Sequence, residues 1–236
     1  MSTTLTVLSD NILFDERLRT TWGYSVLIDH QGSVLLFDTG GDGPILLANM
    51  DTLGINPHNI EGVFLSHAHK DHTGGLAELL KIGIQPKVYL PPAFPESFKN
   101  EVAQFTYIVE TKPGMEIFEG ILSTGEMRGK ISEQALLVRT RQGMVLITGC
   151  AHPGIVRVLK RAKNLMHAPV YLAMGGFHLK DHKQAEIMEI MIKIQSLSVE
   201  KVAPSHCTGD TATRMLAKAY KGDFIQSGVG KIIQLE

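Results

Sequence analysis

Hydrophobic residues recur along this chain in short runs, separated by segments with the spacing of amphipathic helices. Two pairs of apolar runs each flank a Gln-Gly turn and predict β-hairpins, 22–29 with 33–38 and 135–140 with 144–148. Further strands are predicted over 4–8, 62–65, 87–90, 169–174, 201–203 and 231–235, with several short strands between 91 and 133. Helical spacing predicts helices over 44–53, 75–82, 96–105, 155–165, 184–197 and 211–220.

The two halves of the chain carry similar segments. Val26-Leu27-Ile28 resembles Leu136-Leu137-Val138, and the strand that ends in Ser66-His67 parallels the one that ends in Ser205-His206. Unless this similarity is due to chance, two pseudo-symmetric halves pack their sheets face to face with helices outside. The expected fold is α/β, a four-layer αβ/βα sandwich. Strand ends from both halves would then meet at one edge, which carries Asp38, His67, Cys150, His152 and His206.

Composition is that of an ordinary globular protein. The chain has 236 residues, 44% hydrophobic and 20% charged, with a formal net charge of -1, and we expect a single domain over 1–236. This charge gives no global field for nucleic acid or an anionic membrane. The start of the chain lacks the pattern of a secretory signal, the apolar runs are strand-sized, and two cysteines make no disulfide framework. These features favour a cytoplasmic, reduced protein.

The segment from His67 to Gly75 carries the strongest chemical signal. It places His67, His69, Asp71 and His72 just after a predicted strand. Imidazole and carboxylate suit Zn²⁺, with Mn²⁺ and Fe²⁺ as alternatives. The first two histidines lie two residues apart and face the same way on an extended backbone, while the adjacent Asp71 and His72 point away from them. This favours two metal ions, one on each pair; the alternative is a group of hydrogen-bonded or surface histidines.

Four local ligands do not fill two metal shells, so others must come from elsewhere. His152 and His206 each follow a predicted buried strand and are the preferred candidates. His178 follows a third strand and is either a ligand or a residue that orients substrate or protonates the leaving group. Four other histidines lie in polar contexts and are interpreted as surface residues, namely His30, His58, His167 and His182.

The sequence also suggests roles for two cysteines and one aspartate. Cys150 is either a zinc ligand, as a thiolate, or a small buried apolar residue. Cys207 is interpreted as structural. Asp38 follows a buried strand, where its carboxylate either bonds the second ring nitrogen of a metal-bound histidine or caps a turn at Gly40-Gly41.

His67-Ala68-His69-Lys70-Asp71-His72 resembles the HxHxDH signature of the metallo-β-lactamase superfamily. The blocks around Cys150-Ala151-His152, Gly176-Phe177-His178 and Ser205-His206-Cys207 are similar to one branch, the dihydropterin ribofuranosylaminobenzene-phosphate synthase-like proteins. The resemblance spans about 22–209. It implies a dinuclear metal site and the αβ/βα fold.

Two features depart from the family pattern. Cys150 stands where most members have a metal-bridging Asp, and the usual Gly-His-Thr-x-Gly-His block is absent between His72 and Cys150, so His152 is expected to supply the third histidine of the first ion. The segment 91–133 is short for this branch, which suggests a different or more open substrate pocket.

The favoured function is a metal-dependent hydrolase in which hydroxide held between two ions attacks a phosphoester, or an ester or lactone. Asp71 would orient the nucleophile and His178 would lie near the leaving group. An anionic small-molecule substrate is expected because two cations have few acidic neighbours. The alternatives are a pterin-phosphate synthase-like enzyme and a non-catalytic metal-binding module. A di-iron redox protein is disfavoured because such relatives carry Glu at the position of His69, and a dinucleotide enzyme because no G-x-G-x-x-G follows a strand.

Overall fold

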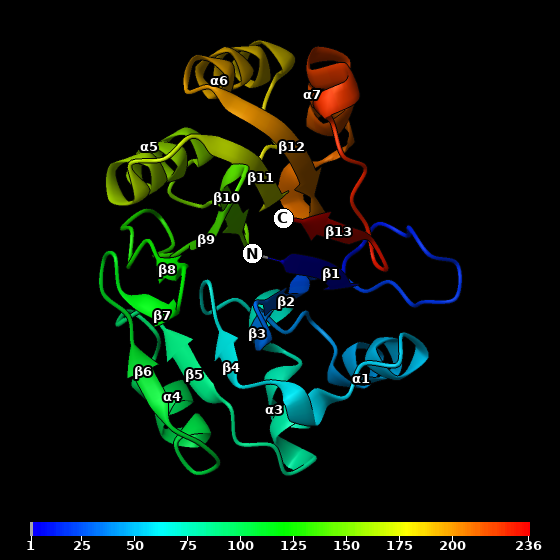
Figure 1. Cartoon of the computed structure of the whole chain (residues 1–236), viewed down its shortest axis with the longest axis vertical. Coiled ribbons are helices and arrows are strands. Elements are labelled where there is room, and N and C mark those ends of the chain that lie inside the picture. The colour runs from blue at the N-terminus through cyan, green and yellow to red at the C-terminus, as the bar shows by residue number, and fades with distance from the viewer. Residues whose placement is uncertain (1) are drawn as a thin grey trace. The chain divides into compact units, whose positions relative to one another are not determined.

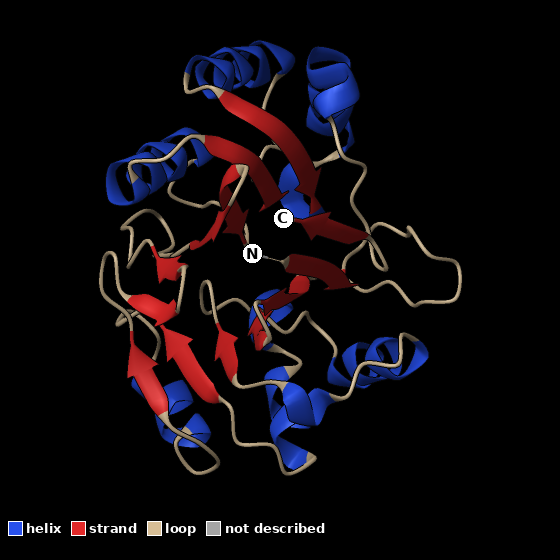
Figure 2. Cartoon of the chain, in the orientation of Figure 1, coloured by secondary structure: helices blue, strands red, loops and turns tan. Residues whose placement is uncertain are grey.

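The computed structural model describes residues 2–236 and contains two sheets covered by helices (Figures 1 and 2). The chain divides into two compact units. The first unit comprises residues 2–112 with 228–236, and the second comprises 113–227. The expectation of a single domain stays a prediction. None of the helices in residues 2–236 has both the length and the apolar character that a membrane crossing requires.

The first unit contains a seven-stranded sheet in the order β13-β1-β2-β3-β4-β5-β6. The four strands from β13 to β3 pair antiparallel, and those from β3 to β6 pair parallel. The strands are β1 (Thr3–Ser9), β2 (Ser25–His30), β3 (Ser33–Phe37), β4 (Gly62–Phe64), β5 (Lys87–Leu90), β6 (Ile108–Glu110) and β13 (Ile232–Leu235). The predicted first hairpin is confirmed: Gln31 and Gly32 turn with φ of 56° and 89°, the conformation that a two-residue hairpin loop needs.

Helices of the first unit pack on one face of this sheet. They are α1 (Gly43–Thr52), the 3₁₀ turn η1 (Pro57–Asn59), α2 (Lys70–Thr73), α3 (Leu76–Lys81) and α4 (Glu96–Val102). The Asp42 carboxylate caps α1 by accepting from the amide of Ile45 at 2.9 Å. Leu46, Leu79 and Val102 from three helices share a core with Leu36 and Val63 of the sheet. The sequence pattern missed α2, because a four-residue helix is too short to show a hydrophobic period.

The second unit contains a six-stranded sheet in the order β12-β11-β10-β9-β8-β7. Strands β10, β11 and β12 pair parallel, and the others pair antiparallel. The strands are β7 (Glu116–Phe118), β8 (Ile121–Ser123), β9 (Leu136–Thr140), β10 (Gly143–Thr148), β11 (Val170–Gly176) and β12 (Val199–Ser205). The helical elements are α5 (Ile155–Met166), α6 (Gln184–Ser196), η2 (His206–Thr208), α7 (Asp210–Tyr220) and η3 (Lys221–Asp223).

Helix α5 shows how the amphipathic pattern places this core. Its buried residues recur every three or four positions and face the sheet; they are Ile155, Val158, Leu159, Ala162 and Met166. Leu159 shares its core with Leu146 of β10 and Ile194 of α6. The opposite face of α5 carries Arg157 and Lys160, which stay exposed. The helix therefore presents a basic face on the outside of the second unit.

The internal repeat is present, but one of the two similarities in the sequence is misleading. In each unit a hairpin is followed by a helix, a parallel strand, a helix and a second parallel strand. By this topology β4 corresponds to β11, and β5 corresponds to β12. The topological counterpart of His67 is therefore His178, which follows β11, and not His206, which follows β12. The shared Ser-His dipeptide aligned two strands that hold different places in their sheets.

Candidate metal centre

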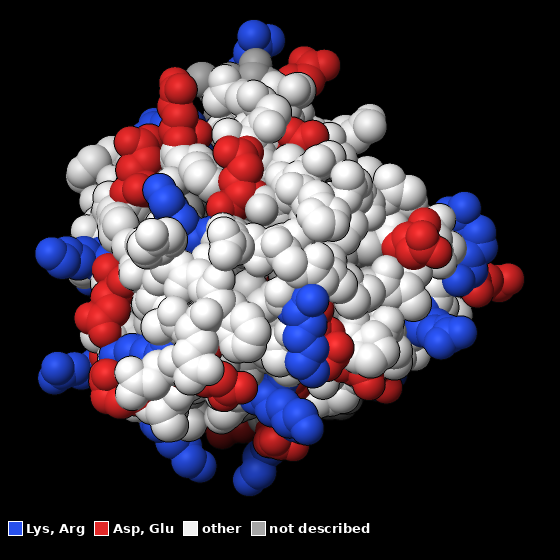
Figure 3. Space-filling model, turned by 90° about the horizontal axis from the view of Figure 1, so that it is seen from below, with Lys and Arg blue, Asp and Glu red and all other residues white. Residues whose placement is uncertain are grey.

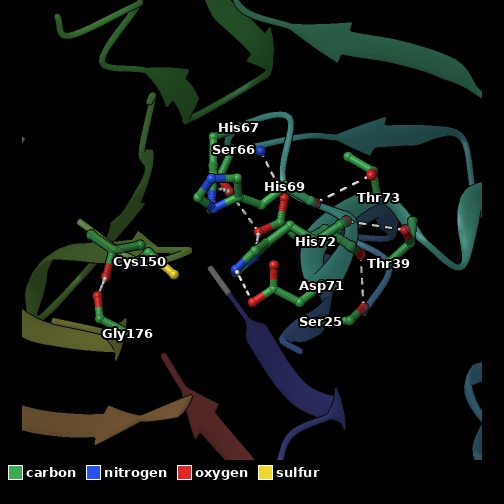
Figure 4. A network of polar contacts seen from close by, with 12 residues as sticks. Ser25, Thr39, Ser66, His67, His69, Asp71, His72, Thr73, Cys150 and Gly176 are labelled. Atoms are coloured by element: carbon green, nitrogen blue, oxygen red, sulfur yellow. Dashed lines mark hydrogen bonds and ion pairs between the residues drawn. The ribbon is translucent and has the colours of Figure 1, made fainter. Parts of the chain in front are cut away.

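Three histidine rings of the first unit gather after β4 (Figure 4). Nε2 of His67 lies 3.1 Å from Nδ1 of His69, and the ring centroids of His67 and His72 are 4.2 Å apart. The expectation that His72 points away from the first pair is wrong. Helix α2 starts directly after His69 and turns the chain back, with the amide of His72 bonded to the carbonyl of His69 at 3.0 Å.

Asp38 organises this cluster from the end of β3. Its Oδ1 accepts from the amide of Ser66 at 2.7 Å, and its Oδ2 lies 2.7 Å from both Ser66 Oγ and Nδ1 of His72. All three residues are fully buried. The alternative that Asp38 caps the turn at Gly40-Gly41 is not what these contacts show. A carboxylate on Nδ1 sets the ring tautomer so that Nε2 presents its lone pair, which is the arrangement found behind metal-binding histidines.

His67 is held in a similar way. Ser66 Oγ lies 2.9 Å from Nδ1 of His67, so Nε2 of that ring is the atom directed toward His69. Two imidazole nitrogens on one tetrahedral Zn²⁺, with bonds of about 2.0–2.1 Å, lie about 3.3 Å apart. The observed 3.1 Å between His67 and His69 fits that spacing. The spacing of these two nitrogen atoms is therefore compatible with a shared divalent ion.

Asp71 lies at the start of α2 beside His72. Its Oδ2 is 3.6 Å from Nε2 of His72, and its side chain is one-fifth exposed. Its backbone carbonyl accepts from the amide of Tyr24 at 3.2 Å, while the carbonyl of His72 accepts from Thr39. Both motif residues are thus tied to the loops that follow β1 and β3.

The two glycines after the motif permit this close approach. A Cβ atom at Gly74 would lie 2.6 Å from the carbonyl oxygen of Gly41, and one at Gly75 would lie 2.2 Å from that of Thr39. Backbone atoms cannot yield to such contacts, so any larger residue would push the motif away from the loop that carries Asp38. The Gly-Gly pair is therefore part of the scaffold of the histidine cluster.

In the second unit, the loop after β10 carries Cys150 and His152 and is held by Glu133. Oε1 of Glu133 accepts from the amides of Cys150 and Ala151 at 2.9 Å each, and Oε2 accepts from the amide of His152 at 2.7 Å. Glu133 is only 2% exposed. Sequence reasoning missed this residue, because a lone glutamate in an irregular segment carries no signal of the three amides it will meet.

Cys150, His178 and Cys207 form a second cluster within this unit. Their potential ligand atoms lie within 4.8 Å of one another, and both cysteines are buried and reduced. The hydrogen bond with Cys150, helped by one with His178, holds the pKa of the Cys207 thiol well below its ordinary value. The hydrogen bond with Cys207 raises the pKa of His178. Sequence reasoning interpreted Cys207 as structural; its position makes it a candidate soft ligand as well.

The two remaining candidates lie close to this cluster in the chain. The ring of His152 lies 4.3 Å from that of His178, centroid to centroid. His206 follows β12 and is 3% exposed. Of the histidines interpreted as surface residues, three are exposed, but His30 is buried in β2 with Nδ1 2.7 Å from Thr3 Oγ1. That interpretation was wrong for His30, because the neighbouring polar residues belong to the hairpin turn and not to a loop.

Positive φ values occur in the segments that follow β3, β10, β11 and β12. Asp38, Ala151, His178 and His206 have φ between 51° and 57°, in the left-handed region that favours glycine. Each such residue costs roughly 1–3 kcal/mol and persists only where surrounding contacts hold it. Backbone strain of this kind concentrates at functional sites, and here it coincides with candidate ligands and with the residue that orients one of them.

Comparisons with known proteins identify the family of this chain. The family model described as the metallo-beta-lactamase superfamily matches residues 22–206. The 7,8-dihydropterin-6-methyl-4-(beta-D-ribofuranosyl)-aminobenzene-5'-phosphate synthase of Methanocaldococcus jannaschii is 28% identical, over 90% of this chain and 89% of its own length.

Solved structures show the same fold. The structure of Tm1679, a metal-dependent hydrolase of the beta-lactamase superfamily, matches with a TM-score of 0.83 at 27% identity and covers 98% of both chains. Human tRNase Z, short form, matches with a TM-score of 0.68 at 13% identity over 99% of both chains, which shows the fold alone. The predicted fold class is confirmed, and this chain belongs to the metallo-β-lactamase superfamily.

Proposed function

We propose that this protein is a metal-dependent hydrolase that cleaves a small anionic phosphoester, or an ester or lactone, with two divalent ions. The observation that carries the proposal is the buried array in which Asp38 and Ser66 hold the Nδ1 atoms of His72 and His67. Similarity to Tm1679, described as a metal-dependent hydrolase, supports the same reaction class.

The proposed ligands begin with the motif that follows β4. His67, His69, Asp71 and His72 supply four, which is too few for two ions. We assign the remaining positions to His152, His206 and Cys150, with Cys207 as the alternative thiolate. Imidazole, carboxylate and thiolate together favour Zn²⁺, while Mn²⁺ and Fe²⁺ accept the nitrogen and oxygen donors.

When bound, two such ions supply a water nucleophile at neutral pH and stabilise the charge that develops on the substrate. Asp71 would orient that nucleophile, because its carboxylate lies beside His72 and is accessible from solvent. His178 would lie near the leaving group and donate a proton to it. Charged side chains of both signs are interspersed on the face drawn in Figure 3, in keeping with a small-molecule substrate rather than nucleic acid.

The Methanocaldococcus jannaschii relative favours a second candidate function, a synthase acting on a pterin phosphate. A non-catalytic binding module, which keeps the fold without a complete set of metal ligands, is the third. Metal content of the purified protein, measured beside hydrolysis of bis(4-nitrophenyl) phosphate and of a homoserine lactone, separates them. About two ions per chain with hydrolysis supports our proposal. Two ions without hydrolysis favours the synthase, and less than one ion after metal add-back favours the binding module.

Replacing His69 with alanine should remove about one metal ion per chain and reduce hydrolysis at least about a hundredfold, while the fold survives. The reason is that His69 is only partly buried and lies outside the hydrophobic core, so its loss removes a donor and not core packing. Elemental analysis measures the metal content, and circular dichroism shows whether the fold survives. His58→Ala, a matched change at an exposed histidine, should alter neither the metal content nor the rate of hydrolysis. Full metal occupancy in His69→Ala would refute the assigned first site.

Replacing Cys150 with serine should weaken the affinity for one of the two ions and leave the other unchanged, because serine keeps the size but not the thiolate. The thiolate-to-metal charge-transfer absorption of Co²⁺-substituted protein should decrease in parallel. Cys207→Ser is the matched comparison. If the band is lost only in Cys207→Ser, Cys207 and not Cys150 is the soft ligand, and our assignment of Cys150 fails.

A further inference from the structure

The second unit contains a cavity of about 520 Å³, within the range of small-molecule sites. It lies among α5, α6 and the segment after β11, and these two helices pack side by side (Figure 1). His152 and His178 line it from the segments that follow β10 and β11, and Arg157, Lys160 and Lys193 line it from α5 and α6. These two sets of residues differ in chemistry, and the cavity wall includes apolar side chains as well.

The apolar part of the wall suits a hydrophobic body. Ile155, Phe177 and Leu179 are nearly fully buried beneath it, while Val156 and Ile190 are partly exposed on its sides. Partly exposed aliphatic side chains beside a cavity gain from contact with an apolar group, at roughly 25 cal/mol per Å² covered. An apolar group of a substrate would be covered by these side chains.

The charged part of the wall is entirely cationic. The residues that line the cavity include Arg157, Lys160 and Lys193 but no aspartate or glutamate. Lys160 is exposed and makes no hydrogen bond or ion pair within the described chain, and the contact of Lys193 with Glu189 is long, at 3.9 Å. Arg157 donates to the carbonyl of Arg128 at 2.6 Å, which holds its guanidinium in place. Uncompensated cations that surround a cavity favour an anion.

The histidine part connects this cavity with the proposed chemistry. His178 borders the cavity, and its buried Nδ1 has no hydrogen-bond partner among the described residues. His152, a proposed ligand, lies against the same ring. A molecule in the cavity would therefore be able to contact both the residues of the proposed reaction and the basic side chains of α5 and α6.

We infer that this cavity binds the substrate through a phosphate group held by Lys160, Arg157 and Lys193, with an apolar body against Ile190 and Val156. The inference rests on the proposed function and narrows its substrate to phosphorylated molecules with such a body. Phosphate is favoured over carboxylate because three cations from two helices line the cavity, and a phosphate carries more charge and more acceptor oxygens.

The test measures binding to the metal-loaded protein by calorimetry, with 1-naphthylmethylphosphonate as a probe that hydrolysis cannot cleave. Lys160→Ala should weaken its binding about five- to tenfold, and Lys160→Arg should restore most of it. Lys218→Ala, which removes one charge from exposed α7, should leave binding unchanged. Ile190→Ser should weaken binding of the phosphonate but not of inorganic phosphate.

Three results would overturn the inference. These are equal binding to the parent protein and Lys160→Ala, equal affinity for the probe and inorganic phosphate, and binding of 1-naphthylacetate as tight as that of the phosphonate. No turnover is required, so the outcome is separate from that of the proposed function. Absence of hydrolysis with Lys160-dependent binding would refute the hydrolase and keep the binding site.

Discussion

Replacing Asp38 with alanine is expected to lower the free energy of unfolding by about 3–5 kcal/mol and to weaken metal binding about 10–100-fold. Three donors lose their acceptor in this variant, namely the amide of Ser66, Ser66 Oγ and Nδ1 of His72. All of them are buried away from water, so no solvent replaces the carboxylate. The ring of His72 would also lose the contact that sets its tautomer.

Urea denaturation and competition with a chelator measure the two effects of the Asp38 change. Asp38→Asn keeps the shape but presents an amide NH₂ to at least one donor, so its effect should lie between those of alanine and the parent. Asp29→Ala is the matched control, because this exposed carboxylate accepts one backbone bond, from Gly32 at 3.2 Å, and should change stability by about 0.5 kcal/mol or less. Parent-like stability and metal affinity in Asp38→Ala would show that Asp38 does not organise the cluster.

Replacing Glu133 with alanine is expected to destabilise the protein by about 3–5 kcal/mol through the loop after β10. The amides of Cys150, Ala151 and His152 all donate to this one buried carboxylate. Without it, three consecutive donors have no acceptor, and the strained φ of 57° at Ala151 is no longer held. The loop should relax, and the affinity for metal should fall because Cys150 and His152 are proposed ligands.

Thermal unfolding and amide hydrogen exchange at 150–152 measure the Glu133 effect. Exchange in this loop should speed up in Glu133→Ala more than exchange in β9 or α5. Glu133→Gln retains one acceptor oxygen and should show about half the loss of stability. Glu116→Ala is the control, since its exposed carboxylate accepts a single bond from the amide of Gly120. Unchanged exchange at 150–152 would mean that the loop is held by other contacts.

The pattern of the sequence was sufficient for most elements because each depends on local spacing. Both hairpins were predictable, since apolar runs of strand length flank a Gln-Gly turn that accepts positive φ. Helix α5 was predictable from the spacing of its apolar residues, which are the positions that the structure buries. The short helix α2 was not, because four residues do not complete a hydrophobic period, and its turn is set by bonds to the carbonyls of His69 and Lys70.

The residues of the candidate site also differ in how far the sequence alone predicts them. The sequence by itself determined the donor types and their spacing at His67, His69, Asp71 and His72, and with them the family, because these residues are neighbours in the chain. Only the tertiary structure decided which side chains support them. Asp38 meets His72 across 34 positions, and Glu133 meets His152 across 19, through contacts between segments whose separation along the chain carries no periodic signal.

The same distinction explains the errors. The Ser-His echo matched two strands by sequence, but a strand's place in a sheet is set by pairing with its neighbours, and pairing put β11 and not β12 beside β10. Cys207 looked like an isolated cysteine until the sheet brought its strand end to Cys150 and His178. Donor groups that are neighbours in the chain can be predicted from the sequence. Donor groups at the ends of distant strands come together only through the pairing of those strands in the sheet, so the tertiary structure decides which of them meet.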